Sequence, residues 1–127
     1  MEKMTRTYED LLAWQKAHQF VVLAYSTIAT FPSYEQFGLC SQFRRAAVSI
    51  PANIAEGYKK LGKADKLRFF NIAQGSLEEC RYYCLLAKDL GYIDEGKFTN
   101  IVESIQNTSY FLNSYIKGVV NKNGIKD

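Results

Sequence analysis

The sequence has few of the residues that mark secreted, membrane-spanning or metal-dependent proteins. It contains three cysteines, one histidine and two prolines in 127 residues. An odd number of cysteines argues against a disulfide framework and favours a reducing compartment. No apolar run approaches the ~20 residues that span a bilayer, and the opening stretch MEKMTRTYEDLL lacks the pattern of a signal peptide. We therefore expect a cytoplasmic protein without membrane association.

Residue types that perform catalysis are also scarce. Because His18 is the only histidine, the chain cannot supply the two Glu-x-x-His motifs of a di-metal helical bundle. Cys80 and Cys84 are one helical turn apart and could share a metal, but they lie among apolar residues and are better explained as small buried hydrophobes. No glycine-rich phosphate-binding loop is present. We expect no catalytic residue, no metal, no cofactor and no small-molecule substrate.

The remaining composition is that of a folded domain. Hydrophobic residues make up 47% of the chain and aromatic residues 14%, which excludes a disordered protein. The length fits one domain, residues 1–127, with a buried core. The formal net charge of +3 permits contact with nucleic acid without requiring it.

Glycine and proline divide the chain into four segments whose apolar residues recur at helical spacing. The segments cover about residues 8–30, 39–61, 64–90 and 94–118, and a frayed polar tail is expected after residue 118. No segment alternates as a strand would. Short connections make consecutive helices antiparallel neighbours, so the sequence predicts an all-α, up-down-up-down four-helix bundle.

The spacing also predicts which side chains face the core. The expected apolar stripes are Leu11, Trp14, Ala17, Val21, Tyr25 and Ile28 in the first helix; Phe43, Ala47, Ile50, Ile54 and Leu61 in the second; Phe69, Ile72, Ala73, Ser76, Leu77, Cys80, Tyr83, Cys84, Ala87 and Leu90 in the third; and a heptad seam of Phe98, Ile105, Leu112 and Val119 in the fourth. Thr7 with Asp10 forms a predicted capping box, Asp94 a predicted N-cap, and Gly91 suits the end of the third helix.

Pro51 falls in the middle of the second segment. A proline inside a helix removes one backbone hydrogen bond and costs ~3 kcal/mol, so the alternatives are two helices or one kinked helix. The apolar stripe keeps its phase from Phe43 to Leu61 across the proline, whereas a break would usually reset it. We therefore expect one helix that is kinked at Pro51.

The outer faces of the second and third helices carry unusually small residues in their middle, where an exposed stripe is normally long and charged. Gly75 is the least expected of them, because glycine costs ~1 kcal/mol against alanine inside a helix. An antiparallel pairing places Ser49 level with Gln74 and Gly75, and Arg45 level with Glu78. Two interpretations stay open: a plain polar surface, or a candidate oligomer interface made by Arg45, Ser49, Ala52, Asn53, Glu56, Asn71, Gly75 and Glu78.

A second candidate surface is basic. It surrounds the connection between the second and third helices and consists of Lys59, Lys60, Lys63, Lys66 and Arg68, offset by Asp65 alone. Such a cluster is either a solvated loop or a candidate nucleic-acid-binding surface that contacts phosphates without reading bases.

Two stretches, QFRRAAVSIPANIAEGYKK and FFNIAQGSLEECRYY, with DLLAWQKA before them and LGYI after them, resemble the four-helix-bundle family of 23S rRNA intervening-sequence proteins. The resemblance covers about residues 8–118. It implies a homopentamer without established enzymatic activity. A fold relative is the accessory protein of diversity-generating retroelements, a pentamer thought to bind nucleic acid and reverse transcriptase. Gln74, Tyr82 and Tyr83 depart from the usual family residues, and Gln74 often has a basic counterpart.

Two functions are therefore expected from different classes. The first is a homo-oligomeric bundle that binds structured RNA, or other RNA or DNA, through repeated basic edges. The alternative is a protein–protein interaction scaffold whose partner contacts the outer apolar residues Leu12, Phe20 and Leu23 of the first helix.

Overall fold

The structure is a computed structural model that describes residues 6–126, with the side chains of residues 6–121. Every regular element within the described residues is helical. The elements are the short 3-10 turns η1 (Tyr8–Asp10) and η2 (Ser33–Glu35) and the helices α1 (Leu12–Ile28), α2 (Leu39–Lys59), α3 (Lys63–Asp89) and α4 (Glu95–Lys126). The predicted all-α class with four helices is confirmed.

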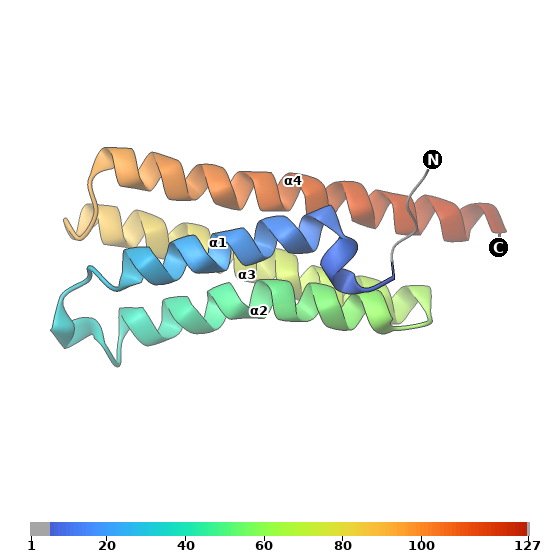
Figure 1. Ribbon diagram of the computed structural model, residues 1–127, viewed down its shortest axis with the longest axis horizontal. Coiled ribbons are helices and arrows are strands. Elements are labelled where there is room, and N and C mark those ends of the chain that lie inside the picture. Colours follow the sequence, from blue (N-terminus) through green and yellow to red (C-terminus); the bar gives the residue numbers. More distant parts are fainter. Residues whose placement is uncertain (1–5, 127) are drawn as a thin grey trace.

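The four helices lie side by side, and consecutive helices run in opposite directions (Figure 1). Helix α1 packs against α2 and α4, and α3 packs against the same two helices. The short α2–α3 connection lies at one end of the bundle, and the α1–α2 and α3–α4 connections lie at the other (Figure 1). No described helix has the length and apolar character needed to cross a membrane.

One continuous core joins the four helices. Its largest fully buried side chains include three phenylalanines from three helices, Phe20, Phe43 and Phe70, and aliphatic residues such as Ile54 and Leu112. The heptad seam of α4 is confirmed at Ile105 and Leu112, which are buried; Phe98 and Val119 at its ends are partly buried and pack against the core.

Several predicted core positions are wrong by about one residue. Phe20, expected on the outer face of α1, is 0% exposed. In α3, Phe70 is buried where Phe69 was expected, and Ile72 and Leu90 are exposed. The reason is geometric: each helix packs against two neighbours, so its buried stripe is wide and spacing alone leaves the phase uncertain by about one position. Tyr25 of α1 is likewise exposed.

Helix α2 runs through Pro51 without a break. Phe43 and Ala47 before the proline and Ile50 and Ile54 around it are all buried, so the single phase across the proline is confirmed, while the kink itself stays a prediction. Leu61 does not continue the stripe and is 99% exposed. The helix ends at Lys59, and the next residue has an extended backbone, which takes Leu61 away from the core.

The predicted helix starts and ends are partly correct. The Thr7–Asp10 capping box forms, but it caps the turn η1 rather than a long helix. The extended backbone of Leu11, with φ −77° and ψ 128°, separates η1 from α1. The single first helix expected over residues 8–30 is therefore divided in two. This division allows η1 to fold back against α2 (Figure 1).

The ends of the last two helices behave as the sequence predicts, with one exception. Gly91 has φ +79°, a conformation that favours glycine, and its N–H donates to the carbonyl of Lys88. Asp94 Oδ1 accepts the N–H of Lys97 at 2.7 Å, which is an N-cap hydrogen bond. Instead of a frayed tail after residue 118, α4 continues to Lys126; Asp127 lies outside the described residues.

Two connections are joined at the end of the bundle opposite the α2–α3 turn. The hydroxyl of Tyr92 donates to Glu35 Oε2 at 2.7 Å, and Glu35 Oε1 accepts the N–H of Leu39 at the start of α2. These hydrogen bonds lower the pKa of the Glu35 carboxyl, with the Tyr92 contact as the larger cause. Glu35 therefore links the α1–α2 connection to the one that follows α3.

Gly57 is the point of close approach between α2 and α3. A Cβ added there would lie 2.6 Å from Cε1 of Phe70 and 3.1 Å from Cβ of Phe69. Because the Phe70 ring is fully buried, it has no free space into which it could move. Gly57 therefore has a packing role that the sequence pattern did not reveal.

Overpacking a core usually costs about 1–3 kcal/mol, and alanine offsets ~1 kcal/mol of this cost through its better helix propensity. We therefore expect Gly57→Ala to destabilise the bundle by up to about 2 kcal/mol net. Urea unfolding followed by circular dichroism measures it. The matched control is Gly118→Ala, at a helical glycine where no atom among the described side chains lies within 4 Å of the added Cβ; this variant should be neutral or stabilising. Equal stability of both variants would contradict the close contact.

Candidate nucleic-acid interface

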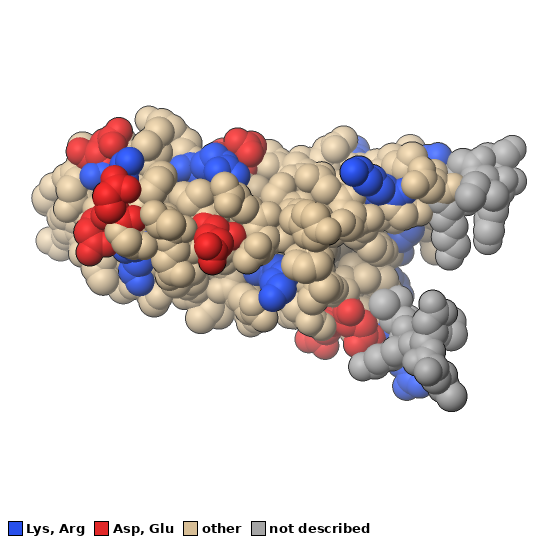
Figure 2. All heavy atoms as spheres, turned by 90° about the horizontal axis from the view of Figure 1, so that it is seen from above, with Lys and Arg blue, Asp and Glu red and all other residues tan. Residues whose placement is uncertain are grey.

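The predicted basic residues gather at the α2–α3 end of the bundle, referred to below as the basic end: Lys59, Lys60, Lys63, Lys66 and Arg68. They come together because α2 ends at Lys59 and α3 begins at Lys63, so the two helix termini are adjacent. On the face seen in Figure 2, most acidic side chains lie in the half of the molecule away from this end. The basic end is thus a local excess of positive charge.

The ring of Phe69 contacts two of these cations. The Lys60 ammonium lies 5.2 Å from the centroid of the Phe69 ring, and the Arg68 guanidinium carbon lies 4.5 Å from the same centroid. Cations are attracted to an aromatic face at these distances. Arg68 also lies 3.6 Å from Asp65, but both side chains are about 60% exposed (61% and 59%), so this ion pair contributes little. Phe69 was expected in the core stripe, and helical spacing gave no sign of its position between two cations.

Lys66 has a different role from its neighbours. Its ammonium donates to the carbonyl oxygens of Tyr58 at 2.7 Å and Gly57 at 3.3 Å, near the end of α2. Partial burial lowers the pKa of this ammonium. Lys66 therefore caps the last carbonyls of α2 and ties that helix to α3. Lys59 and Arg68 are exposed, and Lys60 and Lys63 are partly exposed, so these four residues are the ones of the predicted cluster that remain candidates for phosphate contact.

The second predicted surface, the small-residue patch, lies along α2 and α3. Of its members, Arg45, Ala52, Glu56, Asn71, Gly75 and Glu78 are exposed, and Ser49 and Asn53 are partly buried. Ser49 accepts a hydrogen bond from Ser76 Oγ at 2.9 Å and another from the amide of Asn53 at 2.9 Å. Ser49 was expected level with Gln74 and Gly75, so the antiparallel pairing is correct to within about two residues.

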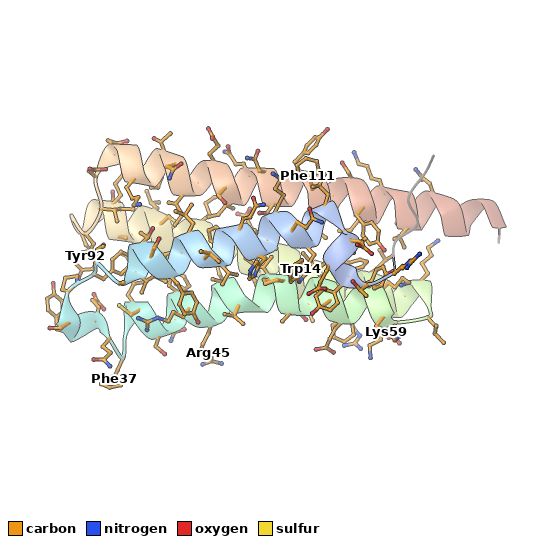
Figure 3. The ribbon with its side chains drawn as sticks, in the orientation of Figure 1. Trp14, Phe37, Arg45, Lys59, Tyr92 and Phe111 are labelled. Carbon is orange, nitrogen blue, oxygen red and sulfur yellow. The ribbon has the colours of Figure 1, made fainter. Side chains whose placement is uncertain are left out.

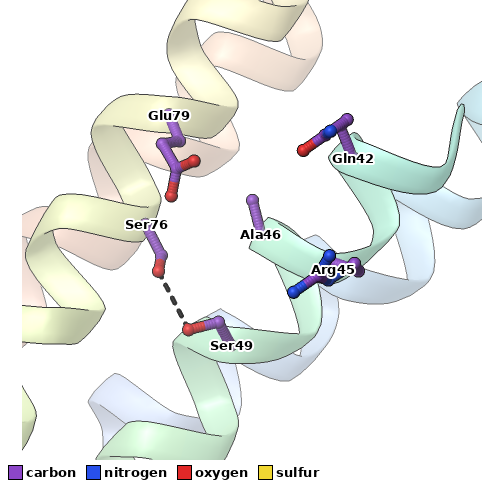
Figure 4. Close-up of a pocket in the computed structure, with 6 residues that line it drawn as sticks. All are labelled: Gln42, Arg45, Ala46, Ser49, Ser76 and Glu79. Carbon is purple, nitrogen blue, oxygen red and sulfur yellow. Dashed lines mark hydrogen bonds between the residues drawn. The ribbon is translucent and has the colours of Figure 1, made fainter. Parts of the chain in front are cut away.

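A hollow of about 230 Å³ opens above this serine pair. Arg45 and Ser49 from α2 line it, together with Ser76 and Glu79 from α3 (Figure 4). Of the two neighbouring glutamates of α3, it is Glu79 that shares this hollow with Arg45. Glu78 lies instead in a groove between α3 and α4, 3.7 Å from Arg81.

Gly75 is open on its outer side. No atom of another described residue lies within 4 Å of a Cβ built there, so no described element of the same chain needs the small residue. Its neighbour Gln74 turns toward α4, where its amide donates to Asn113 Oδ1 at 2.7 Å. This position, where the family often has a basic residue, is here part of a contact between helices.

The two neighbouring cysteines of α3 and the single histidine, which are the side chains best suited to chemistry, are packed against other residues. Cys80 and Cys84 are fully buried, as predicted, and burial raises the pKa of both thiols, that of Cys84 to about 12. His18 stacks on Trp14 with ring centroids 5.1 Å apart. Among the described residues, no three potential ligands of the His, Cys, Asp and Glu types are close enough to hold a metal ion.

The fold and these surfaces define a small all-helical bundle with one basic end. Residues 9–114 match the protein family described as 23S rRNA-intervening sequence protein. This chain belongs to that family, as the two sequence stretches indicated. No protein with a curated description matches the chain.

A solved structure supports the assignment of the fold. The chain is similar to a crystal structure, at 1.70 Å resolution, of a protein of unknown function from the S23 ribosomal protein family of Bacteroides thetaiotaomicron. The two chains are 25% identical, with a TM-score of 0.77 over 84% of this chain and 99% of the other. The similarity therefore extends to nearly the whole of that protein.

Proposed function

We propose that this protein is a non-enzymatic, cytoplasmic, homo-oligomeric bundle that binds structured RNA, or another nucleic acid, through its basic end. The observation that carries the proposal is the arrangement of Lys59, Lys60, Lys63 and Arg68 around one short turn, with Asp65 as the acidic residue among them. Ammonium and guanidinium groups in this arrangement contact phosphates and release counterions, which requires no particular base sequence.

Oligomerisation multiplies the effect of this small surface. One basic end offers few phosphate contacts, but a closed ring of identical subunits repeats it at regular intervals. Several weak contacts to one RNA then act together, because the second contact forms at high effective concentration. The small-residue patch is the proposed contact between subunits, since its open glycine and shallow hollow offer space to a neighbouring helix.

The second candidate function is a protein–protein scaffold on α1. Leu12, Val22 and Tyr25 of this helix are exposed large hydrophobic residues, and they favour a protein partner. Of the other two residues expected on this surface, Phe20 is buried and cannot contribute, and Leu23 is partly buried and packs against the core. A scaffold of this kind would bind its partner with little dependence on salt. Binding of nucleic acid by the basic end would weaken steeply as the salt concentration rises.

The proposal predicts a large salt-dependent effect of neutralising the basic end. We expect Lys59→Gln, Lys60→Gln and Lys63→Gln together to lower the slope of log affinity against log salt by about 2 to 3, or roughly one unit for each phosphate that is no longer neutralised. The measurement is fluorescence anisotropy with a labelled RNA hairpin between about 50 and 200 mM salt, the range in which phosphate contacts weaken most visibly.

The charge-matched control replaces three cations elsewhere on the bundle, Arg44, Arg81 and Lys97, with glutamine. This control should keep the wild-type slope, because the net charge changes equally but the basic end is intact. If the wild-type protein binds no RNA or DNA even at the lowest salt, the proposed function is wrong. If both triple variants lose the same affinity, binding follows net charge and not the basic end.

A further inference from the structure

A second hollow lies beside the basic end, where η1 folds back against the last turns of α2. Its volume is about 410 Å³, within the range of small-ligand pockets. It is lined by Arg6, Thr7, Tyr8, Ala55, Glu56, Tyr58 and Lys59. The sequence gives no sign of it, because it forms only when η1 packs against α2. Lys59, at the same end of the bundle in Figure 3, belongs both to this hollow and to the basic end.

Two tyrosines form the aromatic part of the lining, and both are partly buried. The ring of Tyr8 packs edge-on against Trp14 with centroids 5.0 Å apart. The ring of Tyr58 lies under the Lys66 ammonium at 5.7 Å. Both rings are therefore in contact with other side chains. Ala55 contributes a single methyl group to the lining, and this small side chain leaves room in the hollow.

The remaining lining residues bring charge and rigidity. Arg6 and Lys59 supply two cations, and Glu56 supplies one carboxylate. The wall that carries Arg6 and Thr7 is held by the Asp10 carboxylate, which accepts the N–H of Arg6 at 2.8 Å and that of Thr7 at 3.3 Å. The hollow thus combines aromatic surface, two cations and one carboxylate.

We propose that this hollow binds one nucleoside monophosphate unit, with its base against the tyrosines and its phosphate at Arg6 and Lys59. Bases stack on aromatic side chains irrespective of sequence, and RNA proteins commonly receive unpaired bases in this way. Glu56 can accept a hydrogen bond from the exocyclic amine of adenine, cytosine or guanine. Because the hollow shares Lys59 with the basic end, the unit is an unpaired nucleotide of the bound strand; this inference rests on the proposed function.

Trp14 provides a direct measurement, because it is the only tryptophan in the chain and contacts Tyr8. Titration with AMP should change its fluorescence and saturate, whereas ribose 5-phosphate, which lacks the base, should leave it unchanged. Excitation at the red edge of tryptophan absorption avoids absorption by AMP. No response to AMP, or an equal response to both compounds, would overturn the nucleotide site.

A larger side chain that fills the hollow should prevent AMP binding without changing the charged residues of the lining. We expect Ala55→Leu to weaken AMP binding at least about fivefold, because base stacking on aromatic residues contributes about 1–3 kcal/mol. Leucine is a good helix former, so α2 should keep its helicity. The matched control is Ala64→Leu, at an exposed position near the start of α3 and outside the hollow, which should bind AMP like the wild type.

Oligonucleotides distinguish an unpaired nucleotide of a strand from a free nucleotide. The wild type should bind oligo(A) more tightly than an RNA duplex with the same number of phosphates, and Ala55→Leu should reduce oligo(A) affinity to the duplex level without changing the salt slope. Equal wild-type affinity for both polymers, with no response to AMP, would overturn this inference and leave the proposed function standing. Binding of AMP without binding of either polymer would contradict the proposed function and the strand assignment, and would define a free-nucleotide site.

Discussion

Phe20→Ala should destabilise the bundle by about 3–5 kcal/mol, the usual cost of truncating a buried phenylalanine. Phe20 is 0% exposed and belongs to the core that joins all four helices. Alanine removes most of the ring and leaves a cavity that rigid neighbouring helices cannot close. For a domain of this size the thermal midpoint should fall by roughly 10–20 °C, measured by circular dichroism and confirmed by urea unfolding.

Phe37→Ala is the control, because it makes the same chemical change at a side chain that is 90% exposed and points away from the bundle (Figure 3). Its effect should stay within about 0.5 kcal/mol, as for most surface substitutions. A Phe20→Ala protein with wild-type stability would show that Phe20 does not support the core. The Phe20 side chain would then be available for a protein partner on α1, as the sequence pattern suggested.

The helices themselves were predictable because local signals agree with the global fold. Gly91 and Asp94 mark an end and a start through specific backbone hydrogen bonds, and apolar residues recur at the spacing of a helix. The phase of each stripe was less certain. Where two aromatic residues are adjacent, as in Phe69–Phe70, either one can face the core. Here Phe70 does so, and Phe69 is left between Lys60 and Arg68.

The candidate sites were predictable only where neighbours in sequence are also neighbours in space. The basic end is such a case, since its residues flank one turn. The role of Lys66 was not predictable, because its partners are the carbonyl oxygens of Tyr58 and Gly57 on another helix. The hollow beside η1 was missed for the same reason: the extended backbone of Leu11 sends η1 back across α2, and helical spacing carries no information about that path.

The two helical glycines at the α2–α3 pair illustrate a further limit of sequence reasoning. Gly75 attracted attention because glycine is unfavourable inside a helix, but Gly57 is equally unfavourable and makes the close contact within the chain. The unfavourable helix propensity of a glycine indicates that a small residue is required at that position. It does not identify the neighbouring group that comes close to it. For Gly57 the neighbour is the ring of Phe70, whereas for Gly75 no other residue that the structure describes comes within 4 Å of an added Cβ. A second copy of the chain is the neighbour that we propose.

Gly75→Arg should therefore convert the proposed oligomer into monomers of 14.5 kDa. Within one subunit the change is harmless, since the position is open and arginine is a better helix former than glycine by roughly 0.8–1 kcal/mol. At a subunit boundary the long side chain must either clash or bury an unpaired charge, which is strongly unfavourable. A closed ring repeats this defect at every boundary. Light scattering coupled to size exclusion measures the mass, and circular dichroism should remain helical.

Gly118→Arg separates this effect from the general consequences of adding an arginine. Gly118 is also a helical glycine, and an added Cβ there meets no atom within 4 Å in the described part of the chain, but it lies on α4 rather than on α2 or α3. Its arginine variant should keep the wild-type mass, so that the two variants differ only in which surface carries the new side chain. If Gly75→Arg also keeps the wild-type mass, the small-residue patch faces solvent and Gly75 has no neighbour in any subunit. A wild-type protein that is itself monomeric would remove the oligomer from the proposed function and leave a single basic end to bind nucleic acid alone.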